Sequence, residues 1–264
     1  MAAKKRVLEI CALCLHTKPL CNSHILPEWG YAGILGAGRE MYRMAGSPSE
    51  PFRLAQQGIK EPLMCEDCEG IISGYEDYAK RLFRPGKLVL PTMANDGIVN
   101  RAEYRRFKLF QMSLLWRAHV SKDPFFKAID LGPKHGERLR RMLLDGDPGT
   151  TDDYPCAVLV TLLDGKQLTE YMQSPGARRE GMHREFVIFY AGYAFQYLVA
   201  SHKVHDAIPR AALQANGSFP ITYWDLREFP NYLHVAREVA LRNKPSVDRI
   251  KAYRAAKAKG KAKK

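Results

Sequence analysis

Apolar residues recur at helical spacing in two stretches of the chain, 67–83 and 101–120. The repeating positions are Ile71, Ile72, Tyr75, Tyr78, Ala79 and Leu82 in the first stretch, and Tyr104, Phe107, Phe110, Leu114, Leu115 and Ala118 in the second. Side chains three or four positions apart share one face of a helix, so both stretches are predicted to be helical. A third helix is expected from Gly132 to about Leu144, and a fourth over 228–242.

Shorter apolar segments are bounded by turn signals and predict strands. Two pairs of them flank two-residue turns and are expected to form β-hairpins. These pairs are 156–163 with 167–172 around Asp164-Gly165, and 186–190 with 193–200 around Ala191-Gly192. Nearer the N-terminus we expect short strands at 39–44 and 52–57, and a short helix that begins at Pro27. The pattern as a whole predicts an α+β fold.

The composition is that of a folded globular protein, with 46% hydrophobic and 10% aromatic residues. The longest apolar run, residues 186–200, is too short and too interrupted to cross a membrane. The N-terminus has no apolar segment of the kind found in signal peptides. We therefore expect a cytoplasmic protein with no membrane partner, whose cysteines stay reduced and are free to bind metal.

The formal net charge is +13, and much of it lies at the C-terminal end. The tail 251–264 carries seven Lys/Arg and no acidic residue, and we expect it to be disordered in isolation. Residues 101–145 form a second basic region, which includes Arg105, Arg106, Lys108 and Arg117 on its first helix. These clusters suit a polyanion such as nucleic acid, and they suit equally well a solvated helix face with a solubilising tail.

Two Cys-x-x-Cys pairs, Cys11 with Cys14 and Cys65 with Cys68, give the strongest chemical signal in the chain. Each pair can present two sulfur atoms to one ion from a tight turn, and two pairs complete the tetrahedron that Zn²⁺ prefers. The alternative is four ordinary core cysteines. The paired spacing favours a structural zinc site, which can dominate the stability of a small module.

Cys21 and His24 also have ligand spacing, but zinc binding there would displace one of the two symmetric pairs. We therefore expect Cys21 to contribute to packing, and Cys156 to be a small buried apolar side chain in its strand. His24 is then left for another role.

The order of these motifs resembles that of the four-cysteine branch of the HNH endonucleases. The match covers about residues 8–83 and consists of Cys-x-x-Cys, a polar residue followed by His-Ile-Leu-Pro, and Leu-Met-Cys-x-x-Cys-Glu followed by a helix. We accordingly expect a treble-clef, ββα-like zinc module at 1–84. It is followed by a larger domain of helices and antiparallel strands at 85–250, and then by the tail.

In this family the histidine activates water for attack on a phosphodiester, so the resemblance gives His24 the role of general base. It makes the four cysteines structural zinc ligands, and it places a ligand for a catalytic Mg²⁺ or Mn²⁺ at Glu69. Glu76 lies two helical turns further along the same helix face and could add a second oxygen ligand. For both glutamates the alternative is a solvated helix face.

The chain also departs from the family pattern. Ser23 stands where an acidic or histidine ligand is usual, and residues 59–64 contain no asparagine before the second cysteine pair. The site is thus either a rearranged active site or a finger that kept the fold and lost the reaction. We predict a zinc-stabilised endonuclease that acts on DNA, bound through residues 101–145 and the tail 251–264, in defence or DNA processing. The alternative is a non-catalytic zinc-finger module that binds nucleic acid or protein.

Overall fold

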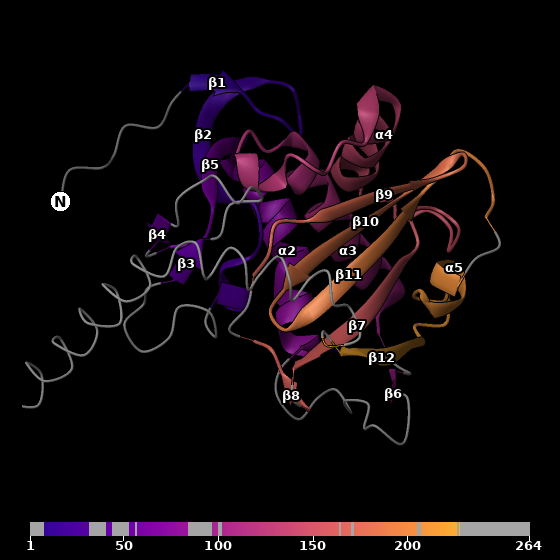
Figure 1. Cartoon of the computed structure of the whole chain (residues 1–264). Helices are drawn as coiled ribbons and strands as arrows, with labels where there is room; N and C mark the ends of the chain where they lie inside the picture. Colours follow the sequence, from indigo (N-terminus) through magenta and orange to yellow (C-terminus); the bar gives the residue numbers. More distant parts are fainter. Residues whose placement is uncertain are drawn as a thin grey trace, which may run out of the picture.

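The structure is a computed structural model, shown in Figure 1. It describes residues 8–31, 41–43, 53–55, 57–83, 97–99, 102–163, 165–169, 172–204, 207–225 and 227. The helix predicted over 228–242 and the tail 251–264 lie outside the described residues.

The N-terminal part is a small antiparallel sheet with the strand order β1-β2-β5. The strands are β1 (Leu8–Ile10), β2 (Thr17–His24) and β5 (Lys60–Cys65). The turn between β1 and β2 holds the first cysteine pair, and β5 runs directly into helix α2 (Glu66–Leu82). β2, β5 and α2 therefore form a strand–strand–helix unit. The helix expected at Pro27 is a single 3₁₀ turn, η1 (Glu28–Gly30).

A two-stranded sheet lies between β2 and β5 in the sequence. It consists of β3 (Met41–Arg43) and β4 (Arg53–Ala55), which pair antiparallel. The two short strands predicted at 39–44 and 52–57 are therefore confirmed, each over three residues.

A seven-stranded sheet forms the larger part of the fold. Six strands follow the order β6-β12-β7-β11-β10-β9, and β8 pairs with β7. The strands are β6 (Gly97–Val99), β7 (Cys156–Leu163), β8 (Lys166–Gln167), β9 (Gly176–Glu180), β10 (His183–Tyr190), β11 (Tyr193–Val199) and β12 (Phe219–Asp225). The expectation of antiparallel strands needs one correction, because β12 pairs with β7 in parallel. It reaches the far side of β7 through the connection that contains α5 (Ala207–Ala211).

The hairpin predicted at Ala191-Gly192 joins β10 to β11. Ala191 has φ 56° and Gly192 has φ 81°, the two left-handed residues that a type I′ turn requires. Glycine takes this conformation without steric cost, and the turn sets the register that pairs Tyr190 with Tyr193. In the other hairpin β7 matches its predicted bounds, whereas β8 is shorter than the strand expected over 167–172.

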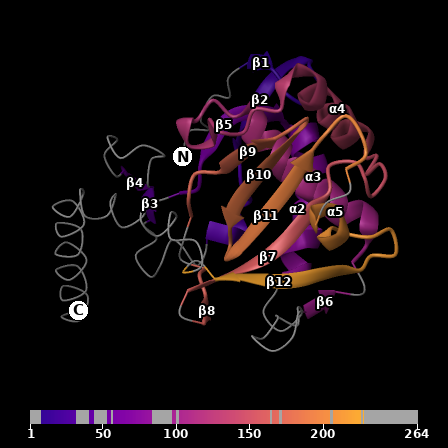
Figure 2. The same ribbon diagram turned by 45° about the vertical axis from the view of Figure 1, so that its right-hand side comes forward.

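Helices α3 (Tyr104–Val120) and α4 (Gly132–Asp145) confirm the two predicted helices of the larger domain, and a 3₁₀ turn, η2 (Pro124–Phe126), lies between them. α2 and α3 lie against the same face of the large sheet (Figures 1 and 2). Every residue of α3 from Phe107 to Ala118 is buried. α3 is therefore a central helix enclosed on all sides. Among the described helices, none is both long and apolar enough to cross a membrane.

One continuous hydrophobic core connects the cysteine-bearing part to the large sheet. It includes Leu26 and Ile72 from the first and Phe195 and Ile221 from the second. Tyr190 of β10 reaches across this junction, where its hydroxyl accepts a 2.7 Å hydrogen bond from the backbone amide of Gly30 and donates to the carbonyl of Pro27. The N-terminal module is thus packed on the larger domain.

Candidate functional site: a four-cysteine metal centre and its polar neighbours

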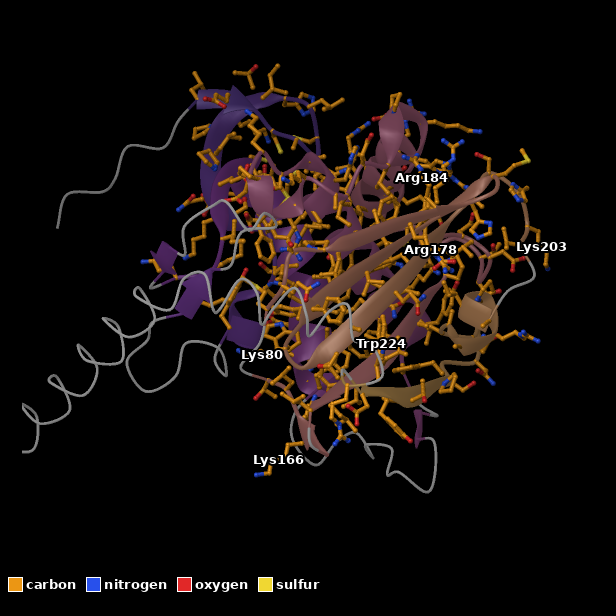
Figure 3. The ribbon with its side chains drawn as sticks, viewed as in Figure 1. Lys80, Lys166, Arg178, Arg184, Lys203 and Trp224 are labelled. Atoms are coloured by element: carbon orange, nitrogen blue, oxygen red, sulfur yellow. The ribbon has the colours of Figure 1, made fainter. Side chains whose placement is uncertain are left out.

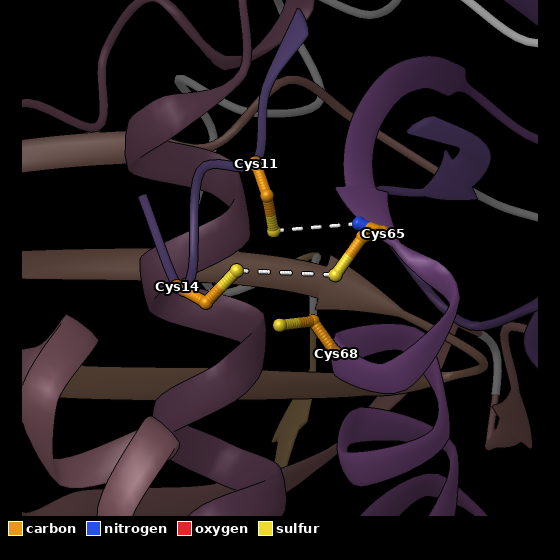
Figure 4. Close-up of side chains that lie close together, drawn as sticks. All are labelled: Cys11, Cys14, Cys65 and Cys68. Carbon is orange, nitrogen blue, oxygen red and sulfur yellow. Dashed lines mark hydrogen bonds between the residues drawn. The ribbon is translucent and has the colours of Figure 1, made fainter. Parts of the chain in front are cut away.

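The four cysteines of the two pairs converge between the β1–β2 turn and the start of α2 (Figure 4). Their sulfur atoms all lie within 4.8 Å of one another, and Cys14 Sγ is 3.9 Å from Cys65 Sγ. Four sulfurs bound at about 2.3 Å to one tetrahedral Zn²⁺ would be about 3.8 Å apart. All four are free thiols, so the predicted grouping is confirmed, and the group fits a metal such as zinc.

The backbone brings each sulfur pair into place. In the first pair the amide of Leu15 donates to the carbonyl of Cys11, and the amide of Cys11 donates to the carbonyl of His16, each at 2.9 Å. Leu15 has a left-handed φ of 63°, which closes this tight turn. In the second pair Cys65 directly precedes α2, and its amide donates to Cys11 Sγ at 3.3 Å.

The thiols of this group differ in how readily they ionise. Burial opposes ionisation of Cys11, but hydrogen bonds from the backbone of Cys14, Cys65 and Leu13 outweigh it and lower its pKa to about 7. Burial, followed by the neighbouring sulfurs, raises the pKa of Cys68 well above its ordinary value. Four thiolates cannot share this volume without a cation, and a metal ion bound to the four sulfurs would supply that charge.

The two remaining cysteines lie outside the group. Cys156 is fully buried in β7, as the sequence predicts for a small apolar side chain, and burial raises the pKa of its thiol. Cys21 is half-buried in β2 and is not part of the sulfur group.

His24 is the last residue of β2, and its imidazole is half-buried. Its Nε2 atom is buried and has no hydrogen-bond partner in the described part of the chain. The ring lies 6.4 Å from the ring of Tyr31, centroid to centroid. Burial, helped by the nearby charge of Lys60, lowers the pKa of His24 to about 4. The imidazole is therefore neutral at pH 7, the form that can accept a proton.

Glu69 lies in the first turn of α2, one residue after Cys68. It is half-buried, and its Oε1 atom is buried without a hydrogen-bond partner among the described residues. Burial raises the pKa of Glu69, while a hydrogen bond from Ser23 and the charge of Arg117 act in the opposite direction. The carboxyl group of Glu69 is thus enclosed by protein. This placement argues against the interpretation of Glu69 as part of a solvated helix face.

Glu76, two turns further along α2, forms an ion pair with a buried arginine of α3. Arg117 Nη1 lies 2.5 Å from Glu76 Oε1, and the exposed fractions of the two side chains are 2% and 20%. The same nitrogen donates to the carbonyl of His24 at 2.8 Å. Arg117 therefore ties β2 and α2 to the central helix. In the sequence, the only indication of this role is that the arginine lies between the apolar residues Trp116 and Ala118.

Within the described residues, the four cysteines are the only group of three or more His, Cys, Asp or Glu side chains close enough to share an ion. His24, Glu69 and Glu76 do not form a second group of this kind. Catalysis by His24 and cation binding by the two glutamates stay predictions.

The basic residues of α3 differ in accessibility. Lys108 is buried and donates to the carbonyl of Tyr154 at 3.1 Å, and Arg117 is buried as described above. Arg105 donates to the carbonyl of Gly146 at 2.8 Å, and Arg106 pairs with Glu103 at 3.2 Å on the surface. Lys108 and Arg117 therefore cannot contact phosphate groups in this fold.

No protein-family model, curated protein or solved structure matches this chain. The HNH resemblance therefore depends on the sequence motifs alone.

Proposed function

We propose that the protein is a zinc-stabilised, HNH-like endonuclease that hydrolyses phosphodiester bonds of DNA, with a treble-clef module as its catalytic part. One observation carries the proposal: in the described part of the chain, His24 Nε2 and Glu69 Oε1 are both buried and both lack a hydrogen-bond partner. Burying a polar atom without a partner costs about 1–3 kcal/mol, so two such atoms in one small unit favour a functional reason for them. These are the two residues to which the motif assigns water activation and cation binding.

The geometry supports a division of roles between zinc and the reacting groups. The four sulfurs hold the β1–β2 turn against the start of α2, which fixes β2 and places His24 at its end. A neutral imidazole can take the proton from an attacking water molecule. A Mg²⁺ or Mn²⁺ ion, when bound, would neutralise charge on the phosphate, and the carboxylate of Glu69 is the oxygen ligand for it.

Glu76 contributes less to cation binding in this proposal. Its Oε1 atom is held by Arg117, which leaves only Oε2 for a metal ion. We assign Glu76 chiefly to fixing Arg117, which in turn holds the backbone of His24.

The test is cleavage of plasmid and single-stranded DNA with Mg²⁺ or Mn²⁺. We expect His24→Ala to abolish cleavage while zinc content and thermal unfolding stay as in the wild type. His202→Ala, which removes an exposed histidine, serves as the matched control and should cleave normally. Equal cleavage by the wild type and His24→Ala would refute the assignment of the base.

DNA binding can be tested separately through the basic tail. Deleting residues 251–264 removes seven positive charges. If the tail binds phosphates, its deletion weakens binding and makes the slope of log K against log salt shallower. The slope changes by about 0.9 for each phosphate of duplex DNA that is no longer neutralised. An unchanged slope would exclude the tail from the interface.

A second candidate function is a non-catalytic zinc module that binds nucleic acid or protein. The observation that favours it is that Arg117 joins the module to α3 by binding the backbone carbonyl of His24 and the carboxylate of Glu76. Under this alternative the wild type binds its partner but does not cleave DNA with either metal ion, and His24→Ala lowers stability alone.

A further inference from the structure

A second cluster of reactive side chains lies away from the zinc module, where the first turn of α4 meets the end of β11. Ser201 Oγ lies 3.2 Å from His135 Nε2 and 3.2 Å from Lys134 Nζ. His135 Nδ1 in turn lies 3.1 Å from the hydroxyl of Tyr154. The two rings meet edge to face, with centroids 5.7 Å apart and an interplanar angle of 87°. Four residues from three parts of the chain thus form one hydrogen-bonded group.

The hydroxyl and imidazole protons of this group can be placed in two ways, and the one that leaves His135 Nε2 unprotonated makes that atom a base for Ser201. Lysine can only donate, so Ser201 Oγ accepts from Lys134 and its own proton is free to point at His135 Nε2. His135 then carries its proton on Nδ1 and donates it to the Tyr154 oxygen. The Tyr154 hydroxyl can donate to the carbonyl of His135 at 3.5 Å. In this tautomer the nitrogen that faces the serine is the basic one.

Ser201 differs in solvent exposure from His135 and Tyr154. Ser201 is exposed, whereas His135 and Tyr154 are only 9% and 4% exposed. Burial lowers the pKa of His135, and the positive charges of Arg184, Lys134 and Arg138 lower it further. The imidazole is thus neutral at pH 7, beside a hydroxyl that solvent and solutes can reach.

Tyr154 is held in an unusual backbone conformation. Its φ is 48°, in the left-handed region that costs a bulky residue about 1–3 kcal/mol and is found preferentially at functional sites. Its carbonyl accepts the 3.1 Å hydrogen bond from buried Lys108, and the guanidinium of Arg138 lies 5.6 Å from its ring centroid. The surrounding structure therefore fixes the residue that orients His135.

An open cavity of about 430 Å³ is lined by residues that neighbour Tyr154 and Ser201 in the sequence, whereas the four residues of the group are not among those that line it. Its lining includes Asp152, two residues before Tyr154, and Lys203, two residues after Ser201. Lys203, which Figure 3 shows beside α5, pairs with Asp152 at 3.0 Å. Arg210 of α5 adds a further positive charge to the lining.

We propose that Ser201 is a nucleophile activated by His135, and that this second site hydrolyses small carboxylic esters. The Ser201 oxygen forms a bond to the ester carbonyl carbon while its proton passes to His135 Nε2. The ester C–O bond then breaks, and the leaving alcohol takes that proton. Water, deprotonated by the same nitrogen, attacks the acyl-serine, releases the acid and restores the hydroxyl. The positive charge of Lys134 stabilises the negative charge that develops on the ester carbonyl oxygen in the tetrahedral intermediate, and Tyr154 is a positioning residue that acts through His135.

The first experiment is covalent labelling of the full-length protein with a fluorophosphonate, which reports nucleophilic serines without a natural substrate. We expect one adduct, mapped by peptide mass spectrometry to Ser201, and p-nitrophenyl acetate hydrolysis that is lost in Ser201→Ala. Ser218→Ala is the matched control, because that hydroxyl donates to Asn216 instead of a histidine, and it should label normally. No adduct at Ser201 would overturn the proposal.

The role of His135 is tested through the rate at which Ser201 is labelled. His135→Gln should slow labelling of Ser201 by at least about a hundredfold, the usual contribution of a general base. Because His135 is buried and its replacement could unfold the protein, exposed Lys134→Gln provides a second variant, for which we expect labelling about tenfold slower. Zinc content and thermal unfolding check that each variant is folded. Equal labelling rates in folded wild type and variants would show that Ser201 is merely an exposed serine.

Discussion

Arg117 and Glu76 form a nearly buried ion pair, 2.5 Å from nitrogen to oxygen, that joins the central helix α3 to α2. The same guanidinium binds the carbonyl of His24 at 2.8 Å and, through Nε, the carbonyl of Ser113 at 3.2 Å. One side chain from the larger domain thus helps to hold the end of β2, which also pairs with β5. The candidate base depends on a residue 93 positions away in the sequence.

Removing one partner of the Arg117–Glu76 pair should lower the stability of the protein. Arg117→Met leaves the Glu76 carboxylate and the His24 carbonyl without their donor, so we expect about 3 kcal/mol lower stability in urea unfolding. The double variant Arg117→Met, Glu76→Leu should recover part of this loss, because it no longer leaves an unpaired charge. Strictly additive losses in the double variant would mean that the two side chains are not coupled.

Metal content tests the sulfur group directly. The purified protein should contain one zinc ion per chain, and Cys68→Ser should lose it and unfold more readily, since structural zinc contributes about 10–16 kcal/mol of apparent binding free energy. Cys21→Ser is the matched control, and we expect it to keep the metal. Elemental analysis gives the answer, and equal zinc loss in both variants would place Cys21 in the site.

The pKa of His24 predicts how stability depends on pH. His24 is neutral in both folded and unfolded chains above its ordinary value of 6.5, so it adds no pH dependence there. Between pH 6.5 and about 4 the unfolded chain binds the proton and the folded chain does not, so stability falls as pH falls. The slope from this group is at most about 1.4 kcal/mol per pH unit.

Urea unfolding of the wild type and His24→Gln over this pH range isolates the contribution of His24. Acid-induced loss of zinc affects both proteins alike and cancels in the difference. The variant should show the shallower slope. Identical slopes would indicate that His24 takes up its proton as readily in the folded protein as in the unfolded chain.

Substitutions at two glycines are expected to change the stability of the protein in opposite directions. A Cβ atom at Gly30 would lie 2.0 Å from Cζ of the buried Tyr190, so Gly30→Ala should destabilise the protein by about 1–3 kcal/mol. Gly74 lies within α2, with no atom within 4 Å of such a Cβ, so Gly74→Ala should stabilise it by up to about 1 kcal/mol. Thermal unfolding of both variants checks this, and a stable Gly30→Ala would argue against the Tyr190 contact.

The elements predicted correctly from sequence are those with a strong local signal. β7 has a continuous apolar run and a glycine turn after it, and the cysteine group follows from spacing alone. β9 was not predicted, because it is an edge strand with mostly polar residues and one partner. β12 was not predicted either, since it contains Pro220, which lies at the start of the strand, before the part that pairs with β7.

The surroundings of the candidate site could not be predicted for a different reason. The Arg117–Glu76 pair and the Ser201–His135 contact join residues 41 and 66 positions apart. Neither pair has a local motif, because the contacts exist only after α2, α3, α4 and the large sheet have packed. The only local sign of the first pair was an arginine within the apolar segment 114–118.

The hydrogen bonds of Tyr190 have a consequence for the order of folding. They bind Pro27 and Gly30, more than 150 positions earlier in the chain. During synthesis the two cysteine pairs therefore emerge long before the strand that completes their packing. Contacts of such long range slow folding, because the intervening chain must be ordered before they form. We expect zinc to bind first and to hold the early chain in a partly formed state, so that zinc supply limits how much newly made protein reaches the native fold.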